Sequence, residues 1–331
     1  MNVLILKPRL DVMFKKGPVP TQRGAIVPIR EHWKNFVEER VAYHKLRKDN
    51  VKVVELPLWQ MTPKLVEDFD AELTYIPHKE AKSFILNVET AAKVNFYMQT
   101  VFPWLFSIDQ LGWGGGKMRQ IKYDGKAPET NIYQDYIKEC VDKNVSKFEQ
   151  PKIDETLNLP KNFVLFPCQL PHDETIKYHS NYSVEKCLSA LIGFTSHWGI
   201  PLVVKGHPVN PGSMAPLRKI VETAQKKGLG TNPIIWVDNV SIHQLVKECS
   251  AVYTVNSGVG LEAVLHGKKI FRFGQSDYDS ISQQVHPTYS SLRTSWNVYS
   301  DVCTERYARF FEKYVQGHID TRKWVWDRIP R

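Results

Sequence analysis

The segment from Tyr253 to Glu262 reads Tyr-Thr-Val-Asn-Ser-Gly-Val-Gly-Leu-Glu, which combines an apolar strand, a small polar turn and the start of a helix. Its turn residues Asn256, Ser257 and Gly258 carry no bulky side chain, so they leave backbone N–H groups open at the start of that helix. Such a helix N-terminus attracts anions, because its unpaired N–H groups and the helix dipole both favour negative charge. The segment therefore predicts a site for a nucleotide phosphate.

Glu262 lies one turn into the same helix. Its carboxylate could accept hydrogen bonds from the ribose of a nucleotide. Alternatively, it is an acidic residue of the first turn that complements the helix dipole, which is common. We keep Glu262 among the candidate binding residues, and both interpretations stay open.

A second group of polar residues, Pro-Cys-Gln-Leu-Pro-His-Asp-Glu-Thr-Ile at 167–176, follows the apolar run 163–166. A carboxylate at the end of a core strand can act as a nucleophile or a general base. Gln169 and Asp173 are therefore candidate catalytic residues. Asp173 could instead cap a turn or the start of a helix, and for this residue taken alone that is the stronger interpretation.

A third group, Val-Val-Lys-Gly-His-Pro at 203–208, also comes directly after a predicted strand. Lys205 offers a positive charge to a phosphate, His207 offers a ring N–H, and Pro208 would hold the loop rigid. The alternative is a lysine and a histidine in a solvated turn.

The second half of the chain alternates predicted strands with predicted helices. Strands are expected at 163–166, 200–204, 234–237, 251–255 and 269–273, and helices at 184–197, 215–227, 242–249 and 260–266. This rhythm predicts an α/β fold with a parallel, doubly wound sheet. In such sheets ligands bind at the carboxyl ends of the strands, which is where all three polar groups fall.

The first half gives a weaker pattern of the same kind, with strands expected at 3–6, 51–56 and 73–76 and a helix at 31–48. Residues 146–160 are polar, contain prolines and show little periodicity, so we interpret them as an interdomain linker. The expected organisation is an N-terminal Rossmann-like acceptor-side domain at 1–145 and a C-terminal nucleotide-sugar-binding domain at 161–303. A helical tail at 304–331 could pack on the first domain.

The composition is that of a globular protein. The chain has 331 residues and a formal charge of +9, which favours anionic partners such as nucleic acid, acidic polysaccharide or a phospholipid surface. The lysines are spread rather than clustered, so the charge could equally serve solubility. We find no apolar run of about 18 residues that would span a membrane. Five scattered cysteines without a Cys-x-x-Cys pair favour neither disulfides nor a zinc site, and a reduced cytoplasm fits best.

Together, three patterns carry a resemblance to a known family: Gln169-x-x-x-Asp173, Lys-x-His-Pro at 205–208, and Ser-x-x-Gly-x-Glu-Ala-x-x-x-Gly-Lys at 257–268. They resemble the bacterial capsule polysaccharide β-Kdo transferases over residues 161–280. That resemblance implies the GT-B arrangement, in which two Rossmann-like domains face a cleft, and a CMP-Kdo donor. The chain departs from the family pattern at Asn256, where Thr or Ser is frequent, and at 275–278, where a more aromatic loop is usual.

The resemblance also implies roles for the candidate residues. Asp173 would be the catalytic carboxylate of a retaining transfer, with Gln169 beside it. Donor-binding residues would be Lys205, His207, Pro208, Asn256, Ser257, Gly258 and Glu262. Because the lysine, the histidine and the helix N-terminus can neutralise a leaving phosphate, we expect transfer without a metal ion or another cofactor.

The leading hypothesis is therefore a cytoplasmic glycosyltransferase that uses a nucleotide-sugar donor and an anionic or lipid-linked glycan acceptor, working in solution or at the inner membrane face. A second hypothesis keeps the fold and changes the acceptor to a modified base in DNA, as in phage enzymes. A third is a non-catalytic protein that binds a nucleotide or a glycan, because fold alone does not prove activity. A nucleotide-sugar epimerase-like enzyme is a more distant alternative.

Overall fold

The computed structural model describes residues 1–10, 26–112, 116–208, 211–229, 232–298 and 302–323. They divide into two compact units. Unit 1 consists of Met1–Gln120 and Tyr314–Arg331, and unit 2 consists of Ile121–Lys313. The end of the expected C-terminal tail, 324–331, lies outside the described residues.

Unit 2 contains a six-stranded sheet in which all neighbouring strands are parallel, with the order β11-β10-β9-β6-β7-β8. The strands are β6 (Val164–Pro167), β7 (Leu202–Lys205), β8 (Ile234–Val237), β9 (Ala251–Thr254), β10 (Lys269–Arg272) and β11 (Gln283–Gln284). The residues of β6, β7 and β9 are buried throughout, which is why these strands are continuous apolar runs rather than alternating ones.

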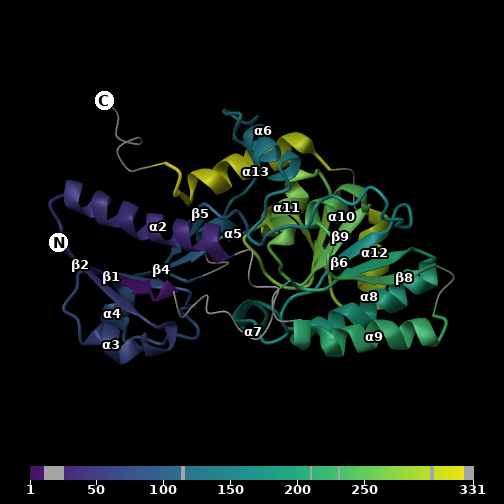
Figure 1. Ribbon diagram of the computed structural model, residues 1–331, viewed down its shortest axis with the longest axis horizontal. Helices are drawn as coiled ribbons and strands as arrows, with labels where there is room; N and C mark the ends of the chain where they lie inside the picture. Colours follow the sequence, from purple (N-terminus) through teal and green to yellow (C-terminus); the bar gives the residue numbers. More distant parts are fainter. Residues whose placement is uncertain (11–25, 113–115, 209–210, 230–231, 299–301, 324–331) are drawn as a thin grey trace. The chain divides into compact units, whose positions relative to one another are not determined.

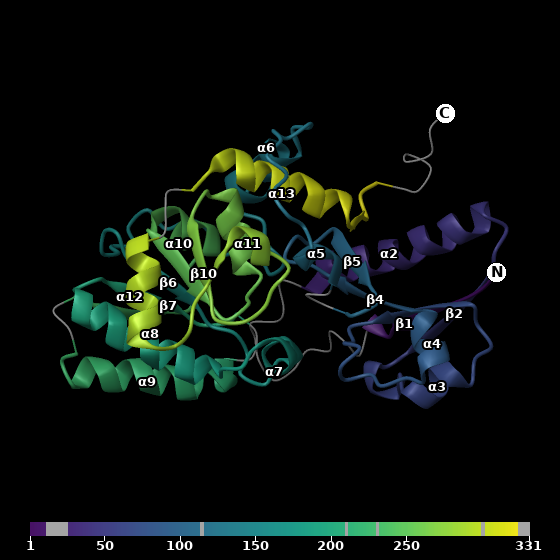
Figure 2. The same ribbon diagram turned by 180° about the vertical axis from the view of Figure 1, so that it is seen from behind.

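Helices cover both faces of this sheet. In Figures 1 and 2, α8 (Val184–Trp198), α9 (Ala215–Lys226) and α12 (Tyr289–Val298) lie on one face, and α10 (Ile242–Glu248) and α11 (Val259–Leu265) lie on the other. Local sequence sets the helix ends. The Ser183 side chain accepts the Lys186 N–H at the start of α8, and Gly199 ends it in the left-handed conformation with a φ of 63°.

Unit 1 contains a mixed sheet with the order β12-β5-β4-β3-β1-β2. Its strands are β1 (Asn2–Pro8), β2 (Asn50–Leu56), β3 (Leu73–Pro77), β4 (Val94–Gln99), β5 (Leu105–Asp109) and β12 (Ile319–Asp320), and its helices are α2 (Ile26–Leu46), α3 (Pro63–Glu67), α4 (Val88–Ala92) and α5 (Gly116–Arg119). The α2 residue Phe36 stacks on Tyr97 and Phe106 of the sheet, at centroid distances of 4.4 and 4.8 Å.

The sheet of unit 1 differs from the expected parallel arrangement at one side, where β4, β5 and β12 pair in antiparallel fashion. The cause is a tight return of the chain. Thr100 donates its N–H to the Leu105 carbonyl, and its hydroxyl oxygen accepts the Phe102 N–H. Such a short connection can join only antiparallel neighbours.

The unit boundaries fall at other positions than those expected from composition. Residues 121–145, expected in the first domain, belong to unit 2, and helix α6 (Ile132–Tyr136) shows why. The Tyr133 hydroxyl donates to the Val264 carbonyl at 2.7 Å, and the Tyr133 and Tyr136 rings pack edge-on against Phe311. Packing against these aromatic rings holds the segment in unit 2.

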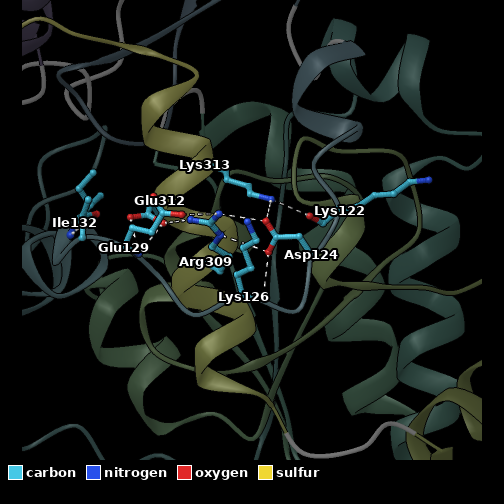
Figure 3. A network of polar contacts seen from close by, with 9 residues as sticks. Lys122, Asp124, Lys126, Glu129, Ile132, Arg309, Glu312 and Lys313 are labelled. Atoms are coloured by element: carbon cyan, nitrogen blue, oxygen red, sulfur yellow. Dashed lines mark hydrogen bonds and ion pairs between the residues drawn. The ribbon is translucent and has the colours of Figure 1, made fainter. Parts of the chain in front are cut away.

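Helix α13 (Thr304–Gln316) is joined to residues 122–132 of unit 2 by a network of charged groups, which Figure 3 shows from close by. Arg309 forms ion pairs with Asp124, Glu129 and Glu312, and Lys313 lies 2.7 Å from Asp124. We call Asp124, Glu129, Arg309, Glu312 and Lys313 the α13 ion cluster. Among the helices whose residues are described, none combines the length and hydrophobicity needed to span a bilayer.

Candidate functional site

The order of strands in unit 2 defines where a ligand would bind. From β6 the chain runs outward through β7 and β8, and then returns to the opposite side of β6 to form β9, β10 and β11. The carboxyl ends of β6 and β9 therefore flank the point where the strand order reverses. In open α/β sheets this switch point is the usual ligand-binding crevice.

Gln169 and Asn256, which follow β6 and β9, join these two strand ends through their side chains. Gln169 Nε2 donates to Asn256 Oδ1 at 2.8 Å, and Gln169 Oε1 accepts the Asn256 N–H at 3.0 Å. Asn256 Nδ2 also donates to the Thr175 carbonyl at 2.9 Å. Both side chains are buried, so in this structure Gln169 positions the turn after β9 through the Gln169–Asn256 clamp.

The turn after β9 is held in place by its own polar atoms. The Ser257 N–H donates to Thr254 Oγ1 at 3.0 Å, and Ser257 Oγ accepts the Val259 N–H at 3.3 Å. These two N–H groups, which the sequence suggested for phosphate binding, already have intramolecular partners. Ser257 and Gly258 are half-buried at the edge of the sheet, so a ligand can still reach them.

Tyr278 explains the glycine in the Ser-x-x-Gly-x-Glu pattern. Its hydroxyl donates to the Ser257 carbonyl at 2.6 Å, and its ring lies directly against Gly260. A Cβ atom on Gly260 would lie 2.2 Å from the ring carbon Cζ, so only glycine fits under the ring. The loop at 275–278, where the chain departs from the family pattern, thus supports the turn after β9.

Lys205 ends β7 on the other side of β6 and is only 7% exposed. Its Nζ donates to the Asp238 carbonyl at 2.9 Å. Burial lowers the pKa of Lys205 to about 8, although the carboxylates of Asp238 and Glu262 attract the cation and oppose the shift. Lys205 is thus a buried amine whose charge is sensitive to pH near neutrality. His207 and Pro208 are half-buried in the loop that follows.

Glu262 is buried at 2% exposure within α11. Burial raises its pKa, because the nearby His243 ring, a hydrogen bond from Ser146 and the charge of Lys205 only partly offset the loss of solvation. His243 Nε2 lies 4.0 Å from Glu262 Oε1. Glu262 is an acidic residue of the first turn of α11, as one interpretation of the sequence has it, and its contact with a ribose stays a prediction.

Asp173 is the N-cap of α7 (Glu174–His179), as the more conservative interpretation of the sequence suggested. Its Oδ1 accepts the Thr175 N–H at 2.9 Å. The side chain is half-buried, so the carboxylate combines a capping role with access to solvent. These two features do not conflict, since a carboxylate has several acceptor positions.

The site thus gathers the ends of β6, β7 and β9 at one edge. Gln169, Asn256 and Thr175 are joined by hydrogen bonds, and Lys205 and Glu262 interact electrostatically across that edge. His207, Pro208, Ser257 and Gly258 lie in the loops after the same strands, and Asp173 lies at the start of α7. Which of these residues contact a donor stays a prediction.

The segment 144–150, most of which the sequence pattern assigns to a linker, makes contacts that this pattern does not predict. Asn144 Oδ1 accepts a hydrogen bond from Ser241 Oγ at 2.5 Å, and Gln150 Oε1 accepts the Ile242 N–H at 2.8 Å. The segment is therefore held against the start of α10. Asn144 stands out within it, because its φ of 55° is rare for a residue other than glycine.

Two Asp-x-Asp pairs occur in the chain, at Asp68 and Asp70 and at Asp277 and Asp279. Asp279 Oδ1 accepts the Ser276 N–H at 2.7 Å and lies 2.9 Å from Arg272 Nε, so this carboxylate already has a cationic partner. Within the part of the chain that the structure describes, no three His, Cys, Asp or Glu side chains are grouped as metal ligands. Metal independence stays a prediction.

Comparisons with known proteins follow the same division of the chain. The profile of a family described as capsule polysaccharide biosynthesis protein matches residues 120–298, which begins where unit 2 begins. The capsule polysaccharide export protein KpsS of Escherichia coli is 27% identical over 143 residues, or 41% of this chain. The match spans about a third (36%) of the length of that relative.

Two solved structures resemble the whole chain. They are the β-Kdo 2,7 transferase and the β-Kdo 2,4 transferase of Thermosulfurimonas dismutans KpsC, each with a TM-score of 0.50. The first is 14% identical and covers 94% of this chain and 90% of its own, and the second is 12% identical and covers 93% and 89%. At this identity the likeness shows the fold, which is GT-B-like with two α/β units.

Proposed function

The chain belongs to the family of capsule polysaccharide biosynthesis proteins, and on this basis we propose that it is a glycosyltransferase. The proposed reaction moves a sugar from a nucleotide donor to a glycan acceptor. One observation carries the proposal: the three polar motifs follow the neighbouring parallel strands β7, β6 and β9, which lie at and beside the switch point of unit 2. A buried amine, a half-buried carboxylate and a turn at a helix start are the groups that such a transfer needs.

The proposed donor is CMP-Kdo. Support comes from the three motifs shared with β-Kdo transferases and from the GT-B-like fold common to this chain and KpsC. Lys205, His207 and the turn at Ser257 would neutralise the charge that develops on the departing CMP, so no metal ion is invoked. The formal charge of +9 suits an anionic or lipid-linked acceptor.

Asp173 is proposed as the catalytic carboxylate of a transfer with retention. Retention by double displacement requires a carboxylate nucleophile that forms a covalent glycosyl intermediate. Gln169 is proposed to act indirectly, by holding Asn256 and the turn that follows β9. The anomeric configuration of the product, read by NMR, tests this part; an inverted product would remove Asp173 from the role of nucleophile.

Asp173→Asn tests the catalytic role without removing the helix cap. Asn caps helices about as well as Asp, so the melting temperature should stay unchanged while turnover falls by about 1000-fold or more. Glu174→Gln is the matched control, because Glu174 is an exposed neighbouring carboxylate and its loss should leave turnover intact. The readout is CMP release from CMP-Kdo with a glycan acceptor, with and without a chelator.

The outcomes separate the parts of the proposal. Equal loss of turnover in both variants would show that the local charge matters rather than Asp173. Turnover that disappears in chelator would overturn metal independence. If UDP but not CMP stabilises the wild-type protein against heat, the proposed glycosyltransferase activity stands and CMP-Kdo is ruled out as the donor.

A further inference from the structure

The segment Asn144–Gln150, which we call the strap, runs along the carboxyl edge of the sheet in unit 2. It is fixed against α10 by the bonds of Asn144 and Gln150 described above, and His243 Nε2 lies 2.9 Å from the Val145 carbonyl. With three attachments within seven residues, the strap has a defined course. Its side chains therefore have definite neighbours at the site.

Two of these side chains contact two different motifs of the candidate site. Ser146 lies close to Glu262 in α11 and opposes the rise in the pKa of its carboxyl. Phe148 packs edge-on against the ring of His207, with the ring centroids 5.6 Å apart. The strap thus contacts the loop after β7 and lies close to the helix after β9.

Lys147 lies between these two contacts and interacts electrostatically with Asp173, the cap of α7. The side chain is half-buried, and its Nζ is 5.9 Å from the centroid of the Phe148 ring. Among the described residues, no ion pair within 4.0 Å joins Lys147 to Asp173 or to another carboxylate. The lysine therefore interacts with the Asp173 carboxylate at longer range than an ion pair.

The surroundings of Lys147 oppose its charge. Burial lowers the pKa of this amine, and the attraction of Asp173 only partly counters the effect. A partly desolvated cation without a close anionic partner costs free energy, which an arriving anion would offset. Lys143 provides the contrast, because it is exposed and already lies 2.8 Å from Glu139.

We propose that Lys147 is a donor-binding residue that holds an anionic group of the donor, either the phosphate or a sugar carboxylate, next to Asp173. This inference rests on the proposed function, because it presumes a nucleotide-sugar donor in unit 2. It assigns the strap a direct part in recognition. The lysine would bind the donor at the reacting end, where Asp173 acts.

Isothermal titration of the full chain with CMP, together with the KM for CMP-Kdo, tests this inference. Lys147→Gln should weaken binding by about 10- to 100-fold, as expected when one charge-assisted hydrogen bond is lost. Lys147→Arg should restore most of the affinity, because it keeps the cation. Lys143→Gln removes one charge from the same stretch of chain and should leave both constants unchanged.

The pattern across ligands identifies the group that is bound. Weaker binding of CMP itself assigns Lys147 to the phosphate, and a higher KM for CMP-Kdo with unchanged CMP affinity assigns it to the sugar carboxylate. The inference would be overturned if Lys147→Gln left the CMP affinity and the KM for CMP-Kdo unchanged, or if Lys147→Gln and Lys147→Arg lost affinity equally. In either case binding of CMP by the wild type would still support the proposed function. A wild-type protein that binds neither ligand would overturn both. The melting temperature of each variant confirms that it is folded.

Discussion

Glu262 and Glu312 are both buried in unit 2, at 2% and 0% exposure, but their environments act on them in opposite directions. Burial raises the pKa of Glu262. Burial acts on Glu312 in the same sense, but hydrogen bonds from Thr130, the Glu129 N–H and Arg309 outweigh it and lower the pKa. The pKa values of the two carboxylates are thus shifted in opposite directions, although both side chains are shielded from solvent.

The difference extends to the groups around each carboxylate. In the α13 ion cluster, hydrogen bonds from Lys313 and Arg309 lower the pKa of Asp124, and the hydrogen bonds that Arg309 donates to Asp124 and Glu312 raise the pKa of Arg309. Around the candidate site burial shifts pKa values towards the neutral forms instead, since it lowers the pKa of Lys205 to about 8 and that of His266, which lies 3.1 Å from His243, to about 3.

The number of hydrogen-bond partners explains the contrast between Glu312 and Glu262. Both oxygens of Glu312 accept the Glu129 N–H at 3.1 Å, and Arg309 lies at 2.6 Å. Within the described residues, Glu262 Oε1 has no hydrogen-bond partner, although its carboxylate is buried. Complete pairing marks the α13 ion cluster as structural, whereas incomplete pairing at the sheet edge suits a site that a polar ligand would complete.

The largest effect is expected from Glu312→Ala. It would leave the buried guanidinium of Arg309 without its closest partner, and the free energy of unfolding should fall by about 3–5 kcal/mol. Chemical denaturation monitored by circular dichroism measures the change. The control is Glu139→Ala, which removes an exposed pair with Lys143 and should cost about 0.5 kcal/mol or less. Similar losses of unfolding free energy in the two variants would show that the α13 ion cluster contributes no more to stability than an exposed ion pair.

Lys205→Met should act on ligand binding rather than on the fold. The affinity for CMP should fall by about 10- to 100-fold, the loss of one charge-assisted hydrogen bond. In the wild type, affinity should decline as pH rises through about 8, because the amine then loses its proton. Titration calorimetry between about pH 6.5 and 9.5 measures the affinity for CMP on both sides of this pKa. A wild-type profile that stays flat would show that the charge of Lys205 does not contribute to binding.

Glu262→Gln should have the smallest effect on stability, within about 1 kcal/mol at neutral pH, because it replaces a carboxylate that its surroundings disfavour. The change in the free energy of unfolding caused by this substitution depends on pH. The folded-state pKa of Glu262 is raised, so the wild type is penalised as pH rises above the ordinary value of 4.5, and the variant gains relative to it. Unfolding free energies at about pH 4 and 8 provide the comparison.

Glu312→Gln should show the opposite trend. The folded-state pKa of Glu312 is lowered, so its contribution to stability is present above the ordinary value of 4.5 and is lost as pH falls through the folded-state pKa. The variant should therefore be least stable relative to wild type near neutral pH and approach it in acid. The same denaturation series measures both variants. Parallel trends in the two would contradict the opposite shifts of the two carboxylates.

The fold of unit 2 was readable from the sequence because its signals are local. Short apolar runs such as 202–205 and 251–254 are typical of buried strands in a sheet covered on both faces, and Ser183 and Ser241 cap the starts of helices. The sequence pattern did not predict the two strands within the aromatic segment 94–109. The chain reverses direction between them through a few hydrogen bonds of Thr100, and no glycine marks the turn.

The candidate site was only partly readable. The strand-end motifs lie where the pattern indicated, but the strap is polar and weakly periodic, and its partners are far away in the sequence. Asn144 bonds to Ser241, 97 residues on, and Gln150 bonds to Ile242, 92 residues on. Such pairings are invisible in a local pattern. For the same reason the burial of Glu262 could not be foreseen.

The Gln169–Asn256 clamp has a consequence for the order of assembly. It joins residues 87 positions apart, and the switch point is complete only after β9 has docked against β6. Contacts of such long range form slowly, because the intervening chain must first be brought together. Nucleotide binding should therefore return during refolding with the slowest phase, after helical circular dichroism has recovered.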